Sequence, residues 1–221
     1  MTPEQRDFFD TAGYLHLPQI LQGNELAAAQ EAVDRYVRTP EAELPPGFGS
    51  TNGTYKHSFA FDKSLEALTR HPTTWPIIRE LTDDRPRLAG GTMRVERHEM
   101  PHAANLHSAR EGLGPQTPRY LVENGRIHCD YFVVFFYFTD VFPGDGGLLI
   151  VPGSHKANFQ RPHGFFYRDG ETEKGYDAEN LPAGLLNATP KAGDVFIISE
   201  LLTHGVLPWK PRDRDRRFAM L

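Results

Sequence analysis

A histidine and an aspartate separated by one residue, His128 and Asp130, are the first side chains in this sequence with an evident chemical use. If they open a β-strand, both side chains point to one face and Cys129 points to the other. Their α-carbons are then roughly 6–7 Å apart, at about 3.3 Å of rise per residue. An imidazole and a carboxylate at this spacing can bind one metal ion from the same wall.

A third ligand has to come from elsewhere, and His204 is the best candidate. It follows an apolar stretch and precedes a glycine, as expected at the rim of a barrel. Two histidines and one carboxylate on one face of an ion leave adjacent positions open, which is the ligand set of non-haem Fe(II) oxygenases. A structural zinc site usually has four protein ligands with cysteine among them, and this chain has one cysteine.

Four motifs occur together in the second half of the chain. They are His-x-Asp before an aromatic strand, GDGGLLIVPGSHK, a Gly-Asp pair opening a strand that ends in Thr-His-Gly, and a following arginine pair. In this combination the chain resembles the phytanoyl-CoA dioxygenase family of Fe(II)- and 2-oxoglutarate-dependent oxygenases. The resemblance extends roughly over residues 125–221, and the N-terminal helix running into GYLHLP also resembles family members. It implies a double-stranded β-helix.

The resemblance also implies roles for individual residues. His128, Asp130 and His204 match the family's catalytic metal ligands, and the cosubstrate arginine matches Arg216 or its neighbour Arg217. A planar guanidinium can hold the distal carboxylate of 2-oxoglutarate through two parallel charge-assisted hydrogen bonds. Only one of two adjacent strand residues can point inward, and spacing favours Arg216. Thr203 and Ser199 are candidate hydroxyl donors to the cosubstrate.

The implied function is a dioxygenase that uses Fe(II), 2-oxoglutarate and O2 and hydroxylates a small organic substrate, with release of succinate and CO2. Family members that halogenate carry a small residue in place of the carboxylate ligand, so Asp130 favours hydroxylation. Two alternatives stay open. One is a retired enzyme that serves as a sensor binding metal and 2-oxoglutarate, and the other is a cupin-like metalloenzyme that does not use 2-oxoglutarate.

Residues 98–118 show little periodicity and predict a loop at the rim of the pocket. The histidines of this loop, His98, His102 and His107, fit no regular ligand geometry, so we interpret them as facing solvent or substrate. We expect His155, in the Pro-Gly-Ser-His turn, to have a structural hydrogen-bonding role. The candidate substrate contacts are His107, Arg110, Tyr120, Phe132 and Trp209.

The first third of the chain predicts helices that would support such a site. Thr2, Pro3 and Gln5 form a capping box that predicts a helix ending at Gly13, before a short strand at 14–17. Asn24 is the expected cap of a second helix that ends at 39–40. Residues 40–60 predict an irregular loop, and 64–71 and 73–81 predict two short helices.

Strand patterns follow at 87–96, 131–138, 195–206 and 217–221, and an irregular excursion is predicted at 160–182. Strands joined by turns favour a mainly β fold, an antiparallel sandwich or barrel with helices packed outside. We expect one oxygenase domain over 1–221, with a mostly helical part at 1–85 and the β-helix core at 86–221. Family members continue beyond the arginine, so we expect this core to lack its C-terminal end or to be completed unusually.

The composition excludes several classes of function. A net charge of −5 argues against a nucleic-acid surface and against electrostatic membrane binding. The longest apolar run, 131–138, is far shorter than the roughly 20 residues of a membrane-spanning helix. The polar, acidic N-terminus is unlike a targeting signal, and a single cysteine excludes an internal disulfide. We therefore expect a cytoplasmic protein with a small-molecule substrate, and no partner among nucleic acids or membranes.

Overall fold

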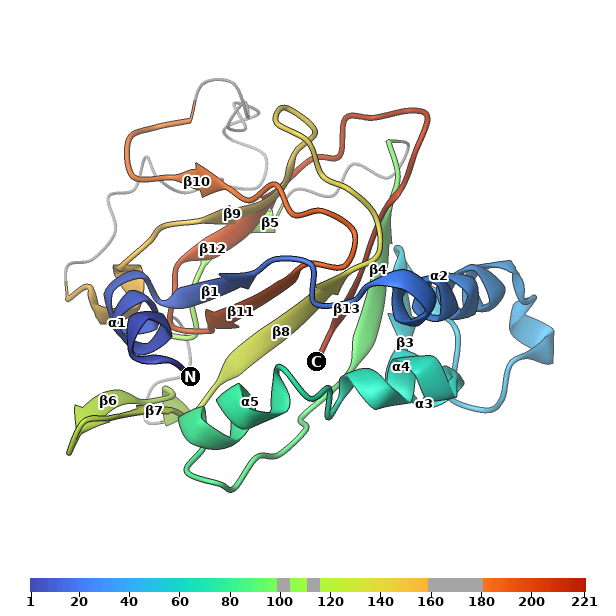
Figure 1. Ribbon diagram of the computed structural model, residues 1–221. Helices are drawn as coiled ribbons and strands as arrows, with labels where there is room; N and C mark the ends of the chain where they lie inside the picture. The colour runs from blue at the N-terminus through green and yellow to red at the C-terminus, as the bar shows by residue number, and fades with distance from the viewer. Residues whose placement is uncertain (99–103, 111–115, 159–180) are drawn as a thin grey trace.

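The computed structural model describes residues 1–98, 104–110, 116–158 and 181–221. Two antiparallel sheets face each other (Figure 1). The larger sheet has the spatial order β1 (Tyr14–Leu17), β11 (Val195–Ser199), β8 (Phe132–Tyr137), β13 (Arg216–Met220), β4 (Thr92–Glu96), β3 (Thr54–Lys56) and β2 (Ser50–Thr51). The smaller sheet has the order β10 (Leu186–Asn187), β9 (Gly147–Ile150), β12 (His204–Leu207) and β5 (Ala104–His107). This arrangement confirms the predicted mainly β, jelly-roll class of fold.

Helices cover the outer face of the larger sheet (Figure 1), as the sequence predicts. They are α1 (Pro3–Ala12), α2 (Gly23–Arg38), α3 (Ser58–Phe61), α4 (Lys63–Leu68) and α5 (Trp75–Leu81), with short 3-10 turns η1 (Glu41–Glu43) and η3 (Ser154–Lys156). No helix among the described residues has the length and apolar character needed to cross a membrane.

Helix α1 forms as its capping residues predict. The Thr2 hydroxyl accepts from the Gln5 amide at 3.2 Å, and the Gln5 side chain accepts from the Thr2 amide at 2.9 Å. Gly13 ends the helix in the left-handed region. The cap predicted for α2 is wrong, because the helix begins at Gly23 and Asn24 lies inside its first turn. The preceding amide of Leu21 donates to Gly193 O at 2.9 Å, which holds the chain just before α2 begins.

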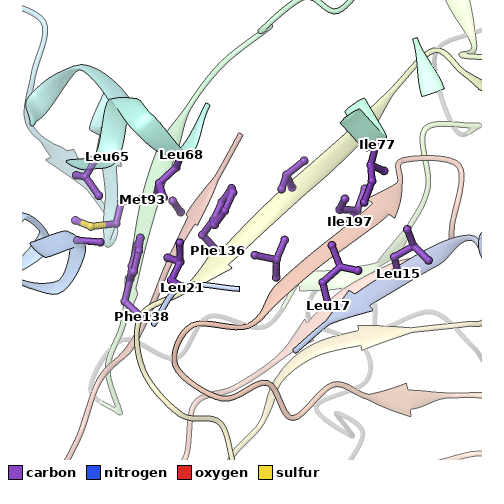
Figure 2. Close-up of a cluster of buried hydrophobic side chains, with 14 of the residues drawn as sticks. Leu15, Leu17, Leu21, Leu65, Leu68, Ile77, Met93, Phe136, Phe138 and Ile197 are labelled. Carbon is purple, nitrogen blue, oxygen red and sulfur yellow. The ribbon is translucent and has the colours of Figure 1, made fainter. Parts of the chain in front are cut away.

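Strand β8 shows why the aromatic run is uninterrupted by polar residues. Val134, Phe136 and Phe138 pack with the helices in one core cluster, and Figure 2 shows Phe136 and Phe138 near Leu68. Phe135 and Tyr137 point the other way, into a second cluster between the two sheets. Because successive strand residues alternate faces and both faces are covered, every position of β8 favours an apolar or aromatic side chain.

Three predicted segments differ from the structure. The predicted rim loop contains β5, a four-residue strand whose pairing with β12 stabilises a sequence of low strand propensity. The stretch 195–206 is two strands, because residues 200–203 carry the chain from the larger sheet to the smaller one. The loop predicted at 40–60 contains the β2–β3 hairpin and α3.

A further hairpin precedes β8, and His128 lies on this hairpin, whereas the sequence predicted it at the start of the aromatic strand. It consists of β6 (Tyr120–Glu123) and β7 (Arg126–Cys129), joined by Asn124 and Gly125 at positive φ. An Asn-Gly pair of this kind is the preferred two-residue hairpin turn. Helices α4 and α5 and strands β4 and β13 begin and end within five residues of their predicted bounds. Most of the loop predicted at 160–182 lies outside the described residues.

Gly146 lies in the connection from β8 to β9, and the close packing at this position can be tested by substitution. Its φ is +101°, and a Cβ there would lie 2.1 Å from Pro208 O. We expect Gly146→Ala to lower the free energy of unfolding by about 3 kcal/mol, from left-handed strain plus overpacking. The matched control is Gly125→Ala, where φ is +73° and nothing lies within 4 Å, so about 1 kcal/mol is expected. Urea unfolding of both variants measures the difference, and equal losses would contradict it.

Candidate functional site

A cavity of about 1100 Å³ lies against the larger sheet and reaches the smaller one. Six residues that the sequence singles out line it: His107, His128, Asp130, Phe132, His204 and Arg216. Six others do not: Arg110, Tyr120, Ser199, Thr203, Trp209 and Arg217. The cavity therefore brings together the predicted metal-binding residues and the favoured arginine, and separates them from most of the predicted substrate contacts.

Two histidines lie side by side at the strand ends of the smaller sheet. His204 on β12 is the register partner of His107 on β5, and their ring centroids are 4.3 Å apart. His204 Nδ1 lies 2.8 Å from Leu202 O. A carbonyl can only accept, so Nδ1 carries the hydrogen and the acceptor lone pair is on Nε2. This is the tautomer that a metal-ligating histidine needs, with its other nitrogen held by a backbone carbonyl.

The side chain of Glu200, which is 16% exposed, lies beside this pair. Its Oε1 is 4.0 Å from His204 Nε2. Burial raises the pKa of the Glu200 carboxyl, and the nearby His107 opposes part of that rise. The backbone is held on both sides, because Glu200 N donates to Tyr131 O at 3.0 Å and Ala109 N donates to Glu200 O at 2.7 Å. A carboxylate is thereby placed next to both imidazoles.

The predicted His-x-Asp pair is arranged differently from the expectation. His128 lies on β7, but Asp130 is past the end of that strand. The Asp130 carboxylate accepts from Arg119 N at 3.3 Å and from Arg119 Nε at 3.1 Å, and its side chain is 45% exposed. The hairpin causes this, since it places Arg119 opposite Asp130. Cys129 is buried and its thiol donates to Tyr131 O at 3.4 Å, and burial raises the thiol pKa to about 11.

Within the described residues, no three side chains of histidine, cysteine, aspartate or glutamate come close enough to hold a metal ion. The structure therefore does not bring His128, Asp130 and His204 together as a finished ligand set. All three residues line one cavity, and the histidine that lies beside His204 is His107.

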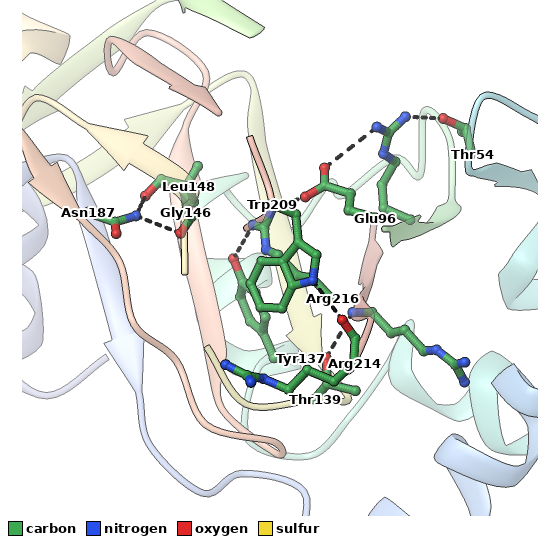
Figure 3. A network of polar contacts seen from close by, with 12 residues as sticks. Thr54, Glu96, Tyr137, Thr139, Gly146, Leu148, Asn187, Trp209, Arg214 and Arg216 are labelled. Carbon is green, nitrogen blue, oxygen red and sulfur yellow. Dashed lines mark hydrogen bonds and ion pairs between the residues drawn. The ribbon is translucent and has the colours of Figure 1, made fainter. Parts of the chain in front are cut away.

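Arg216 is the member of the arginine pair that points inward. It is 1% exposed, and Figure 3 shows it between Glu96 and Tyr137. Nη1 donates to Glu96 Oε2 at 2.6 Å and Nη2 donates to Tyr137 Oη at 3.2 Å. Burial acts to lower the pKa of this guanidinium, but Glu96 and Tyr137 outweigh burial and raise it. Arg217 points out of the cavity, where it pairs with Asp34 and Asp215.

A second arginine adjoins this network. Arg94 Nη2 lies 3.5 Å from Glu96 Oε1, and the Arg94 guanidinium also donates to Thr54. Arg94, Glu96 and Arg216 all line the cavity. Two guanidiniums therefore share one carboxylate, which leaves one positive charge for an anionic ligand.

Two proposed hydroxyl donors do not reach the cavity. Ser199 Oγ is buried and accepts from Leu201 N at 3.3 Å. Thr203 is also buried, and its amide donates to Ser154 Oγ at 2.7 Å. Ser199 is the last residue of β11 and Thr203 directly precedes β12, and both residues are buried. The sequence prediction for Ser199 and Thr203 is therefore not supported.

Three predicted substrate contacts have structural partners instead. Tyr120 Oη donates to Asp10 at 2.9 Å, and the Arg110 guanidinium donates to the carbonyls of His155 and Ala157. Trp209 is buried and its Nε1 donates to Arg214 O at 2.8 Å. His98 Nδ1 lies 2.8 Å from Lys210 O, and His102 lies outside the described residues.

Sequence reasoning missed the contributions of Arg94, Glu96 and Glu200. A signal for the first two exists in the alternation of Thr92–Glu96, where charged and apolar residues occupy opposite faces of a strand. The signal for Glu200 is weaker. It lies four residues before His204, and only the turn between β11 and β12 brings the two side chains together.

His155 is a buried structural residue, as its turn motif predicts. Nε2 donates to Asp10 O at 3.0 Å, and Nδ1 has no hydrogen-bond partner. Nδ1 lies so close to Gly13 that a Cβ there would be 2.5 Å from it. Burial lowers the pKa of the imidazole from 6.5 to about 4. The neutral ring is therefore the form that fits the folded protein.

This predicts a pH dependence of stability. Below pH 6.5 the unfolded chain protonates His155, while the folded protein resists protonation until about pH 4. The free energy of unfolding therefore falls between pH 7 and pH 5, by about 2 kcal/mol from this group at 1.36 kcal/mol per pKa unit. In His155→Gln, whose amide can still donate to Asp10 O, this part of the slope is expected to disappear. Urea unfolding of both proteins at the two pH values tests it, and parallel slopes would contradict it.

Comparisons with known proteins agree on one family and fold. The family model described as phytanoyl-CoA dioxygenase (PhyH) matches residues 9–210. HygX from Streptomyces hygroscopicus, solved with nickel and 2-oxoglutarate bound, has a TM-score of 0.77 and 23% identity over 100% of this chain and 85% of its own. EctD from S. alaskensis, solved with 2-oxoglutarate and 5-hydroxyectoine, has a TM-score of 0.72 and 20% identity over 100% and 75%.

A third similar structure is SnoK, a non-haem α-ketoglutarate-dependent carbocyclase from nogalamycin biosynthesis, with a TM-score of 0.68 and 18% identity over 100% of this chain and 82% of its own. Curated proteins show no significant match to this sequence. At these identities the solved structures establish the jelly-roll fold, and the family match covers most of the chain.

Proposed function

Because this chain belongs to the phytanoyl-CoA dioxygenase family, we propose that it is a non-haem iron oxygenase that uses 2-oxoglutarate and O2 to oxidise a small organic molecule. One observation carries the proposal. The His107–His204 pair and the buried guanidinium of Arg216 line the same cavity. A metal-binding end and an anion-binding end are thus available to one ligand.

The histidine pair fits an iron ion. Imidazole nitrogens suit Fe(II), and His204 has the tautomer in which Nε2 can bind it. We propose His204 and His107 as the two histidine ligands. The set predicted from the sequence, His128, Asp130 and His204, stays the competing assignment.

The other end of the cavity fits 2-oxoglutarate. Arg216 can donate in parallel to a carboxylate, and Glu96 and Tyr137 hold its guanidinium in place. The extra positive charge from Arg94 favours a dianion. When bound, iron and 2-oxoglutarate would supply the oxidising chemistry, with succinate and CO2 as products. The chain's part is to orient the cosubstrate and to exclude water.

The cavity walls fit a small organic substrate. Phe132, Leu148, Val206 and Phe218 contribute apolar surface, and the volume of about 1100 Å³ is slightly larger than that of most ligand pockets. Hydroxylation is the outcome that we propose for this substrate. With one cysteine in the chain, a reducing compartment such as the cytoplasm is our proposed location.

The metal ligands can be tested by absorption. Anaerobic addition of Fe(II) and 2-oxoglutarate to the protein is expected to produce a visible charge-transfer band. His204→Ala and His107→Ala are expected to abolish it, since each removes an imidazole ligand. His98→Ala is the control, because His98 is outside the cavity and should leave the band unchanged.

A band that survives in His107→Ala but is lost in His128→Ala would favour the competing ligand set. The retired-sensor alternative predicts a band without succinate release when a panel of metabolites is added. The alternative without 2-oxoglutarate predicts no band at all.

The arginine assignment can be tested by cosubstrate affinity. Arg216→Lys keeps the positive charge but loses the planar fork, so the Kd of 2-oxoglutarate is expected to rise by at least about tenfold. Arg217→Lys is the matched control, because that side chain pairs with Asp34 and Asp215 outside the cavity. Calorimetric titration of the metal-loaded proteins measures both values. A larger effect of the Arg217 substitution would overturn the assignment.

A further inference from the structure

The proposed metal site has two histidines, and two carboxylates that could join them line the same cavity. Asp130 is the one that the sequence favours, and Glu200 is the one that lies beside His204. Residue 109, two positions after His107, is alanine and has no donor atom. A His-x-Asp motif built on His107 is therefore absent, and a carboxylate that joins this histidine pair comes from another segment of the chain.

We propose that Glu200 is the carboxylate ligand of the metal held by His107 and His204. This inference rests on the proposed function and deepens it by naming the ligand set. Glu200 begins the connection between β11 and β12, and His204 is the first residue of β12, so one short segment would provide two of the three ligands.

The distance between them is compatible with closure on an ion. Nitrogen and oxygen ligands bind such metals at about 2.1 Å, so two neighbouring ligand atoms lie about 3 Å apart. Glu200 Oε1 and His204 Nε2 are 4.0 Å apart, and no complete metal-binding group occurs among the described residues. The Glu200 backbone is held by Tyr131 and Ala109, so the proposal assigns the remaining 1 Å or so to a rotation of the Glu200 side chain.

The limited exposure of the Glu200 carboxylate favours binding of a cation. Its side chain is 16% exposed, and its ion-pairing contact is with His204. A buried carboxylate is costly unless it is paired or bound to a metal. The Asp130 carboxylate does not have this desolvation cost, because its side chain is 45% exposed and already paired with Arg119. Moving Asp130 onto the metal would break that pair.

Metal binding by matched variants tests the proposal. Glu200→Gln and Asp130→Asn each replace a carboxylate by an amide of the same shape. Anaerobic titration of the full chain with Co(II) gives the Kd from calorimetry and from the cobalt absorption bands. We expect Glu200→Gln to weaken Co(II) binding by more than about 100-fold, beyond the loss caused by outer-shell changes. Asp130→Asn should stay within about threefold of the parent.

Folding of the variants is controlled in the same experiment. Glu200→Gln removes a buried charge, so without metal its Tm should equal or exceed that of the parent, and Co(II) should no longer raise it. If Asp130→Asn loses Co(II) binding while Glu200→Gln keeps it, or if both variants bind normally, the proposal is overturned. If the parent itself binds no Co(II), the proposed function fails as well, which separates the two failures.

Discussion

The site depends on how the chain crosses from the larger sheet to the smaller one. Strand β11 ends at Ser199, β12 begins at His204, and Glu200 N and Glu200 O are bonded to Tyr131 and Ala109. These two backbone hydrogen bonds connect the end of β5, the start of β8 and the crossing segment at one point. Each contributes only about 1 kcal/mol, but together they set where His204 and Glu200 meet His107.

The second constraint is a buried charge. Arg216 is almost completely enclosed, so its guanidinium is tolerated only with Glu96 and Tyr137 as partners. The register of β13 with β4 places Arg216 opposite Glu96 and Phe218 opposite Arg94. Sheet register therefore sets the charge balance at this end of the cavity. Removing one partner alone would leave a buried charge uncompensated.

Much of the fold could be predicted from the sequence, because its signals are local. The capping box of α1, the apolar run of β8 and the Gly-Asp start of β11 act within a few residues. The inward choice between Arg216 and Arg217 follows from strand alternation once the strand exists. Strand β5 could not be found in this way, since its four residues gain their structure from pairing with β12.

The candidate site shows where such local reasoning ends. The spacing argument for His128 and Asp130 assumes that both belong to one strand, but β7 ends at Cys129 and the hairpin pairs Asp130 with Arg119. By contrast, His107 and His204 are nearly a hundred residues apart and meet only because their strands are in register. Ligands on different strands carry no spacing signal. The signal of Glu200 in the sequence is correspondingly weak, although its carboxylate lies 4.0 Å from His204.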